Sequence, residues 1–235
     1  MPSAVVVLAA GSGSRVGAGT NKVLLPLRGV PVVVWSLRHA LEVPDVAVVV
    51  LVARPGEEAA LSEAVAPHLT SYAGSGGSAP EVRLVTGGAT RHASEAVALL
   101  ALAAEVDAGS VDVVAVHDGA RPLASADLLA RTLETAREHG GAVPAVPVQG
   151  LLTRDLRALD RGVVGVQTPQ GFRAPELLAA YAAAEHDGFE GTDTAACFAR
   201  HCDLPVVVVA SDAGNLKVTW PEDVALVSRL LSPFP

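Results

Sequence analysis

Lysine is rare in this chain of 235 residues, and both lysines fall where they could meet a phosphate. Of the 17 basic residues, 15 are arginines; the two lysines are Lys22, after a glycine-rich turn, and Lys217, near the C-terminus. Lysine presents a compact ammonium with rotatable donors, whereas arginine presents a rigid planar fork. The chain therefore has a chemical reason to place a point charge at these two positions. The alternative is drift in a composition rich in alanine and arginine, and the sequence around each lysine must decide.

Lys22 closes a glycine-rich segment that follows an apolar run. Glycines let the backbone approach a phosphate with its N–H groups turned inward, and Arg15 and Lys22 add positive charge. The spacing matches neither the dinucleotide-binding G-x-G-x-x-G pattern nor the Walker A loop, in which lysine precedes Ser or Thr. The segment therefore predicts an anion site of another kind. Its members are Ala9, Ala10, Gly11, Ser12, Gly13, Ser14, Arg15 and Lys22.

A carboxylate, Asp118, stands at the end of a second apolar run, between His117 and Gly119. Such a carboxylate could hold a ribose or Mg²⁺, which proteins usually bind through one or two carboxylates together with substrate phosphates. The structural alternative is that Asp118 caps a turn, as Asp-Gly pairs often do. We assign His117 mainly to structure, because a lone histidine at a strand end is more often hydrogen-bonded in place than used as an acid or base.

Two further strings lie in the C-terminal half, at residues 167–172 and 215–223. Pro169 holds Thr168 extended, and Pro221 is typical of the first turn of a helix, so the second string delivers Lys217 just ahead of a helix. A turn and a helix cap would explain each string singly. The occurrence of all four strings in order along one chain has a very small chance probability.

The elements that would position these residues alternate along the chain. Ala/Leu/Glu-rich stretches separate most of the apolar, β-branched runs at 4–8, 46–52, 82–85, 111–116, 142–147 and 206–209. Runs without polar alternation indicate strands covered on both faces. We predict a single α/β domain over residues 1–235, built on an open, doubly wound, mostly parallel Rossmann-like sheet with ligands at the carboxyl ends of its strands. Residues 149–166, which are rich in charge, are predicted to leave the sheet as an arm.

The composition disfavours several classes of protein. Half of the chain is hydrophobic, which supports a large core, whereas 3% aromatic residues and a net charge of -8 speak against a nucleic-acid partner. Cys197 and Cys202 lack a second pair and match neither a zinc site nor a disulfide framework, so we expect free thiols. No signal peptide precedes the first strand, and no apolar run approaches the ~20 residues of a membrane span. We therefore expect a soluble, cytoplasmic protein without a membrane partner.

Together with Gly87, Gly88, Arg91, Ser94 and Thr192–Asp193, these strings resemble the 2-C-methyl-D-erythritol 4-phosphate cytidylyltransferases of the non-mevalonate isoprenoid pathway. The resemblance covers nearly the whole chain. It implies a nucleotidyltransferase fold and transfer of CMP from CTP to the polyol phosphate, with release of pyrophosphate. It also implies Mg²⁺ or another divalent cation, and a homodimer.

The resemblance further implies a role for each site residue. The catalytic residues would be Arg15, Lys22 and Lys217. The nucleotide would be bound by Ala9, Ala10, Gly11, Ser12, Gly13, Ser14, Gly87, Gly88, Ser94 and Asp118, and Asp118 would also serve the metal. The phosphorylated acceptor would be bound by Arg121, Thr168, Thr192, Arg157 and Arg161.

This chain departs from the family pattern near the acceptor. The family usually has an Asp-Thr pair where this chain has Gly150–Leu151, and its arm, which reaches a partner's site, is several residues longer than the segment between Val148 and Gln167. Ala89 replaces an acidic residue, and Asn21 replaces a proline. The arginine that reaches the partner could be Arg154, Arg157 or Arg161.

Two alternative functions therefore stay open. The acceptor could be ribitol 5-phosphate or a phosphonate of a specialised pathway, because the departures fall on the acceptor side. The chain could also bind a nucleotide without catalysis, although its retained charged residues speak against this.

Overall fold

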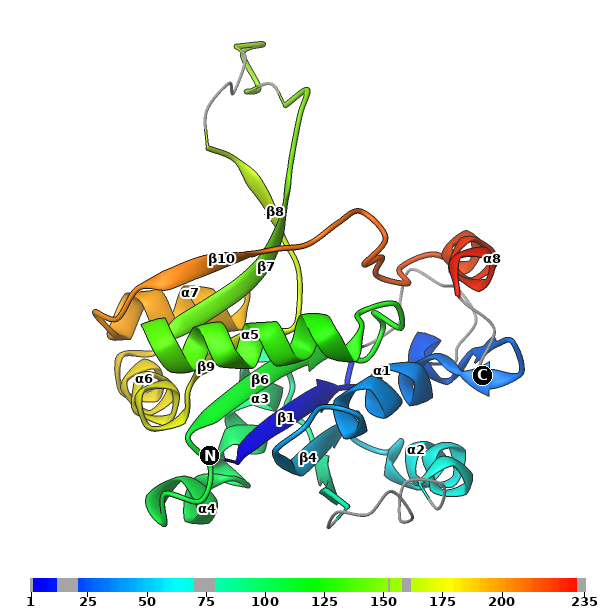
Figure 1. Ribbon diagram of the computed structural model, residues 1–235, viewed down its shortest axis with the longest axis horizontal. Helices are drawn as coiled ribbons and strands as arrows, with labels where there is room; N and C mark the ends of the chain where they lie inside the picture. Colours follow the sequence, from blue (N-terminus) through cyan, green and yellow to red (C-terminus); the bar gives the residue numbers. More distant parts are fainter. Residues whose placement is uncertain (1, 12–20, 70–78, 152, 158–161, 232–235) are drawn as a thin grey trace.

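The computed structural model describes residues 2–11, 21–69, 79–151, 153–157 and 162–231 (Figure 1). The strands of its main sheet are β1 (Ser3–Leu8), β4 (Val46–Ala53), β5 (Glu81–Thr86), β6 (Val113–Asp118), β7 (Gly141–Pro147), β8 (Val164–Val166), β9 (Gln170–Arg173) and β10 (Val206–Ala210). The α-helices are α1 (Val32–Leu41), α2 (Glu58–Val65), α3 (Arg91–Leu100), α4 (Ala103–Asp107), α5 (Ala126–His139), α6 (Ala174–Asp187), α7 (Thr194–His201) and α8 (Pro221–Leu230). Short elements are the hairpin strands β2 (Pro26–Leu27) and β3 (Val30–Pro31) and the 3₁₀ turns η1 (Lys22–Leu24) and η2 (Ala66–His68).

The main sheet is mostly parallel. Its strands follow the order β10-β7-β9-β6-β1-β4-β5, and β8 pairs with β7 outside this path. The neighbours β6, β1, β4 and β5 are parallel, as are β7 and β10. Leu8 lies opposite both Val52 and Asp118, so the carboxyl ends of β1, β4 and β6 reach one edge together. This confirms the predicted open α/β sheet and places its ligand-binding edge.

Side chains of the central strands alternate between two helical layers. Val5 and Val7 pack in a core with α1, α2 and α5, whereas Ala4 and Val6 pack in a second core with α3, α4, α6 and α7. Figure 1 shows α1 and α5 in front of the sheet. Both faces of the strands are therefore buried, which is the physical reason for their continuous apolar runs.

β9 runs antiparallel between β6 and β7, and the sequence did not predict it. Phe172 is fully buried and lies against Phe198, with ring centroids 4.7 Å apart. A Cβ on Gly171 would lie 3.0 Å from the Thr132 carbonyl oxygen, so only glycine allows α5 to pack this closely. Four residues with a single large apolar side chain are too few to show a strand period. Tertiary packing holds β9, and β9 brings Thr168 to the end of β6.

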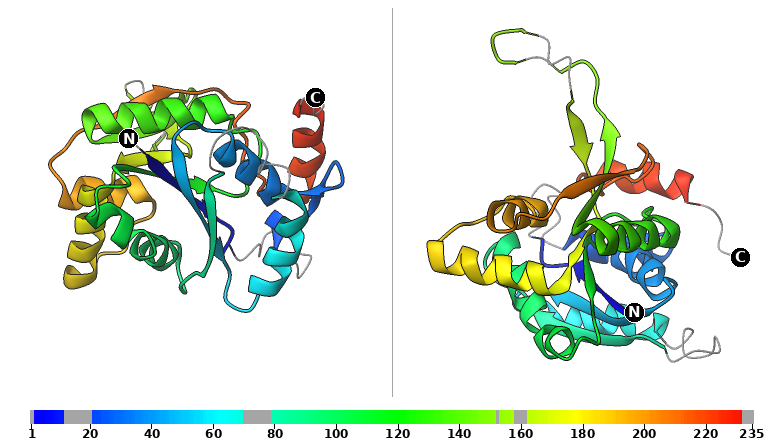
Figure 2. Two further views of the ribbon diagram at one scale, coloured as in Figure 1. Left: turned by 60° about the horizontal axis from the view of Figure 1, so that its bottom comes forward. Right: turned by 60° about the vertical axis from the view of Figure 1, so that its left-hand side comes forward.

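An arm projects from the sheet beyond β7 and β8 (Figures 1 and 2). The two strands pair antiparallel at its base, with Ala145 opposite Val166 and Pro147 opposite Val164. The projection lies within residues 149–166, the segment expected to leave the sheet, but the last three of these residues form β8 and stay paired with β7. Its length relative to the family, and the single domain over 1–235, stay predictions.

A third hydrophobic cluster fastens the Lys217 segment to the β2–β3 hairpin. Arg28 and Gly29 close the hairpin with φ values of 52° and 79°, the sign that a tight two-residue hairpin turn requires. Leu27 from this hairpin, Val218 and members of α1 and α8 are buried together. The residue after Lys217 is therefore anchored in a core.

α8 begins where the sequence predicted, with Pro221 in its first turn. The Asp223 carboxylate accepts hydrogen bonds from the backbone N–H groups of Thr219, at 2.7 Å, and Trp220, at 2.8 Å. This cap fixes the chain just after Lys217.

Two remaining expectations concern the thiols and the membrane. Cys197 and Cys202 are both free; Cys197 is buried and Cys202 partly so. Within the described ranges, no helix has the length and apolar character needed to cross a bilayer.

Candidate active site

The predicted motifs meet in one cleft at the carboxyl edge of the sheet. The cleft has a volume of about 610 Å³, within the range of small-molecule sites. The predicted residues that line it are Ala10, Gly11, Lys22, Gly88, Ser94, Asp118 and Lys217. The two lysines, which lie far apart in the sequence, therefore line the same cleft.

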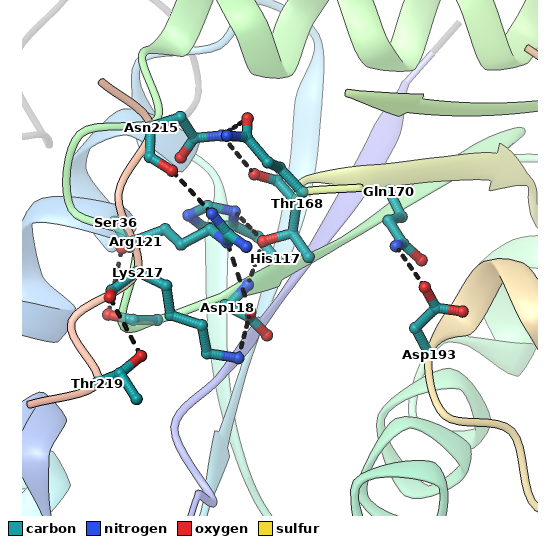
Figure 3. Close-up of polar contacts among 12 residues, drawn as sticks. Ser36, His117, Asp118, Arg121, Thr168, Gln170, Asp193, Asn215, Lys217 and Thr219 are labelled. Carbon is teal, nitrogen blue, oxygen red and sulfur yellow. Dashed lines mark hydrogen bonds and ion pairs between the residues drawn. The ribbon is translucent and has the colours of Figure 1, made fainter. Parts of the chain in front are cut away.

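Asp118 lies at the centre of a cluster of cations (Figure 3). Its Oδ1 atom is 2.5 Å from Nη1 of Arg91, and its Oδ2 atom is 2.7 Å from Nζ of Lys217 and 3.6 Å from Nε of Arg121. Burial alone would raise the pKa of Asp118, but Arg91, Lys217 and Arg121 hold this pKa well below its usual range. The carboxylate is therefore ionised at physiological pH, and it orients the cations around it.

Behind Asp118, two buried side chains support the strand end. The Asp118 backbone N–H donates to Oγ1 of Thr168 at 3.0 Å, and this oxygen lies 3.2 Å from Nδ1 of His117. Burial lowers the pKa of His117 to about 4, so the imidazole is neutral. The structural role expected for His117 is confirmed. Thr168, expected to bind the acceptor, lies behind Asp118 and is not among the described residues that line the cleft, and its acceptor role stays a prediction.

The backbone around Lys217 is clamped by two hydrogen bonds to the segment after β6. Nη1 of Arg121 donates to the Asn215 carbonyl at 2.7 Å, and the Val218 N–H donates to the Ala120 carbonyl at 2.7 Å. The Asn215 amide in turn donates to the Thr168 carbonyl at 3.0 Å (Figure 3). Lys217 thus leaves a fixed backbone toward Asp118.

The side chain of Asn21 fixes the backbone next to Lys22. Its side-chain amide nitrogen donates to the Ala9 carbonyl at 2.8 Å and to Oε2 of Glu57 at 2.7 Å, and its oxygen accepts from the Val23 N–H at 3.3 Å. Asn21 therefore joins the end of β1 to the turn η1, which begins at Lys22. Asn21 is therefore the N-cap of this turn, a role that its residue type favours.

Four residues of the predicted anion site, Ser12, Gly13, Ser14 and Arg15, lie outside the described residues. Ala9 is buried beneath the cleft, and its carbonyl is the acceptor for Asn21. The roles of this segment stay predictions.

The loop between β5 and α3 needs its glycines because α3 comes very close. A Cβ on Gly87 would lie 2.7 Å from Oγ of Ser94, and one on Gly88 would lie 2.5 Å from Cβ of Ala93. The Gly88 N–H donates to Oγ of Ser94 at 3.1 Å, and Thr90 caps α3 by accepting from the Ala93 N–H at 3.1 Å. The N-terminus of α3, with its positive dipole end, thus borders the cleft and favours an anion there.

The residues expected to bind the acceptor are spread out. Arg121 contacts Asp118, whereas Thr192 is exposed, next to the Asp193 cap of α7, which Figure 3 shows apart from the Lys217 group. The Arg157 side chain, on the arm, is 83% exposed and pairs with Asp155 at 2.9 Å. Arg161 lies outside the described residues. The acceptor roles of these residues stay predictions.

Two arginines of the cleft had no predicted role. Arg54, directly after β4, lines the cleft and pairs with Glu57 at 3.2 Å. Arg91, the first residue of α3, lines it and contacts Asp118. Both follow strands that end at the ligand-binding edge, which is the signal that could have found them.

The donors suit a divalent cation only in part. No group of three or more His, Cys, Asp or Glu side chains within the described ranges is placed to hold a metal. Asp118 faces the cleft as an ionised carboxylate, and both its oxygens contact cations. One carboxylate together with substrate phosphates is a donor set that Mg²⁺ accepts. The site therefore fits an ion shared with a bound phosphate and does not fit one held by these protein side chains alone.

Comparisons with known proteins decide the family. The family model "IspD: 2-C-methyl-D-erythritol 4-phosphate cytidylyltransferase" matches residues 3–232. The chain belongs to this family. The 2-C-methyl-D-erythritol 4-phosphate cytidylyltransferase of Symbiobacterium thermophilum is 40% identical, over 98% of this chain and 93% of the relative. The family suggested by the sequence motifs is therefore confirmed.

Solved structures agree with the assignment to the IspD family. The crystal structure of the Thermus thermophilus cytidylyltransferase shares 31% identity and a TM-score of 0.71, covering 98% of both chains. The 4-diphosphocytidyl-2C-methyl-D-erythritol synthase of Anaerococcus prevotii is 25% identical, with a TM-score of 0.78, over 97% of this chain and 95% of the other. The chain thus matches these family members over almost their full length.

Proposed function

We propose that this chain transfers CMP from CTP to 2-C-methyl-D-erythritol 4-phosphate and releases pyrophosphate. The observation that carries the proposal is the convergence of Lys22 and Lys217 with ionised Asp118 in one cleft of an IspD family member. Binding alone would also use these charges, so turnover with CTP is the property that distinguishes an enzyme from a nucleotide-binding protein.

An oxygen of the acceptor phosphate attacks the α-phosphorus of CTP. A new P–O bond forms there, the bond from this phosphorus to the oxygen bridging to the β-phosphate breaks, and pyrophosphate leaves with that oxygen. The attacking phosphate is already ionised near neutral pH, so the reaction requires no general base, and His117 is neutral and buried. Catalysis then comes from alignment and from stabilising charge in the transition state.

Lys22 and Lys217 supply this charge stabilisation. Asp118 holds the Lys217 ammonium at 2.7 Å before substrate arrives, so little reorganisation is needed during the reaction. A bound Mg²⁺ would neutralise triphosphate charge, and Asp118 would hold it together with substrate phosphates.

The acceptor is tested by measuring pyrophosphate release from CTP with a panel of acceptors. We expect turnover with 2-C-methyl-D-erythritol 4-phosphate. Turnover restricted to ribitol 5-phosphate or a phosphonate would show that the natural acceptor is one of these compounds. These compounds belong in the panel because Gly150–Leu151 offer no polar side-chain group. No pyrophosphate with any acceptor would refute the activity.

We also propose that the protein acts as a cytoplasmic homodimer joined through its arm. The arm carries exposed apolar side chains, with Leu156 77%, Val166 45% and Val164 39% exposed. A second copy would cover them and could receive Arg157. Sedimentation analysis should give a dimer, and a monomer at micromolar concentration would refute this arrangement.

Asn21→Ala should weaken CTP binding. The change removes the cap of η1 and both contacts of the amide nitrogen, a loss of about 1 kcal/mol in typical caps, and frees the turn that carries Lys22. We expect KM for CTP to rise about fivefold, which corresponds to that energy. Ser125→Ala removes the cap of α5, where Oγ accepts from the Leu128 N–H at 3.1 Å, and should lower stability without changing KM. Equal KM values in Asn21→Ala and wild type would contradict the role of Asn21.

Gly88→Ala should impair CTP binding more severely. The new Cβ would meet Cβ of Ala93 at 2.5 Å, so the loop or the first turn of α3 must shift. Overpacking of this kind costs about 1–3 kcal/mol, and here the shift falls on the cleft wall. We expect KM for CTP to rise between about fivefold and a hundredfold in steady-state assays. Gly140→Ala, at the end of α5 where a new Cβ would lie 2.6 Å from Cβ of Leu204, is the control and should lower stability only.

A further inference from the structure

Glu95 is a buried carboxylate that the proposed mechanism does not use. It lies one turn into α3, directly behind the cleft wall, and is 1% exposed. Burial raises the pKa of Glu95, and a buried carboxyl group is costly unless it is paired and hydrogen-bonded. The partners of Glu95 therefore show what this buried group does.

Each oxygen of Glu95 has a defined partner. Oε1 lies 2.7 Å from Nε of Arg91, one turn earlier on α3. Oε2 accepts a hydrogen bond from the hydroxyl of Tyr181 on α6. The Tyr181 ring is itself fixed, because it stacks on His92 with ring centroids 4.6 Å apart. The second helical layer thus holds the Glu95 carboxylate in one orientation.

Arg91 carries this orientation into the cleft. While its Nε binds Glu95, its Nη1 lies 2.5 Å from Oδ1 of Asp118. The guanidinium is planar, so fixing Nε also fixes the direction of Nη1. Oδ1 of Asp118 is thereby occupied, and Oδ2 faces Lys217 at 2.7 Å. A continuous chain of contacts runs from Tyr181 through Glu95, Arg91 and Asp118 to Lys217.

We propose that Glu95 is a positioning residue for nucleotidyl transfer, which holds Arg91 on Asp118 Oδ1 so that Oδ2 orients Lys217. The inference rests on the proposed function. Without Glu95, the Arg91 fork can turn away from Asp118, and the carboxylate can rotate away from Lys217. Charge that must reorganise during the reaction stabilises the transition state less than charge fixed beforehand.

The chain offers a matched pair away from the cleft. Arg137 on α5 binds Asp112 at 2.7 Å and 3.0 Å, through Nε and Nη2. This pair joins the same two kinds of charged group, and neither residue lines the cleft. Asp112→Asn therefore controls for the general cost of breaking a carboxylate–arginine pair.

The test compares Glu95→Gln in two backgrounds, wild type and Arg91→Ala. In the wild-type background we expect kcat to fall about tenfold, with KM for CTP changed less than about threefold. In the Arg91→Ala background the same change should lower kcat less than about twofold, because its route to Asp118 is gone. Asp112→Asn should lower the melting temperature and leave kcat unchanged. An equal loss in both backgrounds, or lost stability with unchanged kcat, would overturn the proposal.

Tyr181→Phe provides the same test if the Glu95→Gln variant does not fold. It removes one hydroxyl and keeps the ring on His92, and we expect an approximately threefold loss of kcat that vanishes in the Arg91→Ala background. Unchanged kcat in Tyr181→Phe would overturn the proposal.

A crystal structure of either variant is a readout independent of turnover. Movement of Arg91 Nη1 away from Asp118 Oδ1 supports the positioning role, and an unchanged contact refutes it. If the wild-type protein turns over no acceptor, the proposed function fails while this structural comparison still decides the role of Glu95.

Discussion

Lys217→Ala is expected to lower kcat/KM at least about a hundredfold, since a fixed electrostatic donor in an enclosed site contributes about 3 to 4 kcal/mol to transition-state stabilisation. The Lys217 ammonium lies 2.7 Å from Asp118, and its backbone is held through Asn215 and Val218. Alanine keeps this backbone and removes the charge. Steady-state rates of pyrophosphate release with CTP measure the loss, and Lys22→Ala should show one of similar size.

Arg131→Ala is the control for loss of a positive charge. Arg131 lies on α5 and pairs with Asp127 at 2.9 Å, with both side chains substantially exposed. Its removal should leave turnover unchanged. Lys217→Arg should recover only part of the activity, because a planar fork does not replace a compact ammonium. Turnover near wild type for both lysine-to-alanine variants would contradict the assignment of the site.

The protonation of His117 is expected to remove about 3 kcal/mol of stability between pH 7 and pH 4, at 1.36 kcal/mol per pKa unit. Burial lowers the pKa of His117 from 6.5 to about 4. Within this window the unfolded chain binds a proton that the folded protein excludes, so the free energy of unfolding falls as the pH falls. The effect is small above pH 7, most of it is present at pH 4, and it levels off about one pH unit below the folded pKa. Urea denaturation across this range measures it.

His117→Gln isolates this contribution. Other titrating groups shift both proteins, so the quantity of interest is the difference in unfolding free energy between wild type and His117→Gln. Asp118 is present in both proteins, so the stability that its depressed pKa contributes, which is lost as the pH falls toward and below its ordinary value of 3.8, cancels in this difference. We expect the advantage of wild type over the variant to shrink as the pH falls. A difference that is constant from pH 7 to pH 4 would show that His117 titrates normally.

The sheet and the cleft could be predicted from the sequence because their signals are local. Continuous apolar runs such as 46–52 mark strands covered on both faces, and a motif directly after such a run must lie at the ligand-binding edge. Lys22 and Asp118 were placed in this way. The structure adds that Lys217 reaches the same edge through the third hydrophobic cluster.

Features that depend on contacts between distant segments could not be predicted. β9 is four residues long and is held by Phe172 and by close packing on α5. The hydrogen bond from Tyr181 to Glu95 joins positions 86 apart, and nothing in the sequence near either residue indicates the other. The position of Thr168 behind Asp118 has the same origin, since it follows from the insertion of β9.

Oxygen labelling tests the central claim most directly. The enzyme is supplied with CTP, Mg²⁺ and acceptor whose phosphate group carries ¹⁸O, and both products are analysed by ³¹P NMR and mass spectrometry. Attack of the acceptor phosphate on the α-phosphorus predicts a CDP-linked product that retains all of the label, including label in the bridging oxygen, and unlabelled pyrophosphate. Label in the pyrophosphate, or hydrolysis of CTP without a CDP-linked product, would contradict the account.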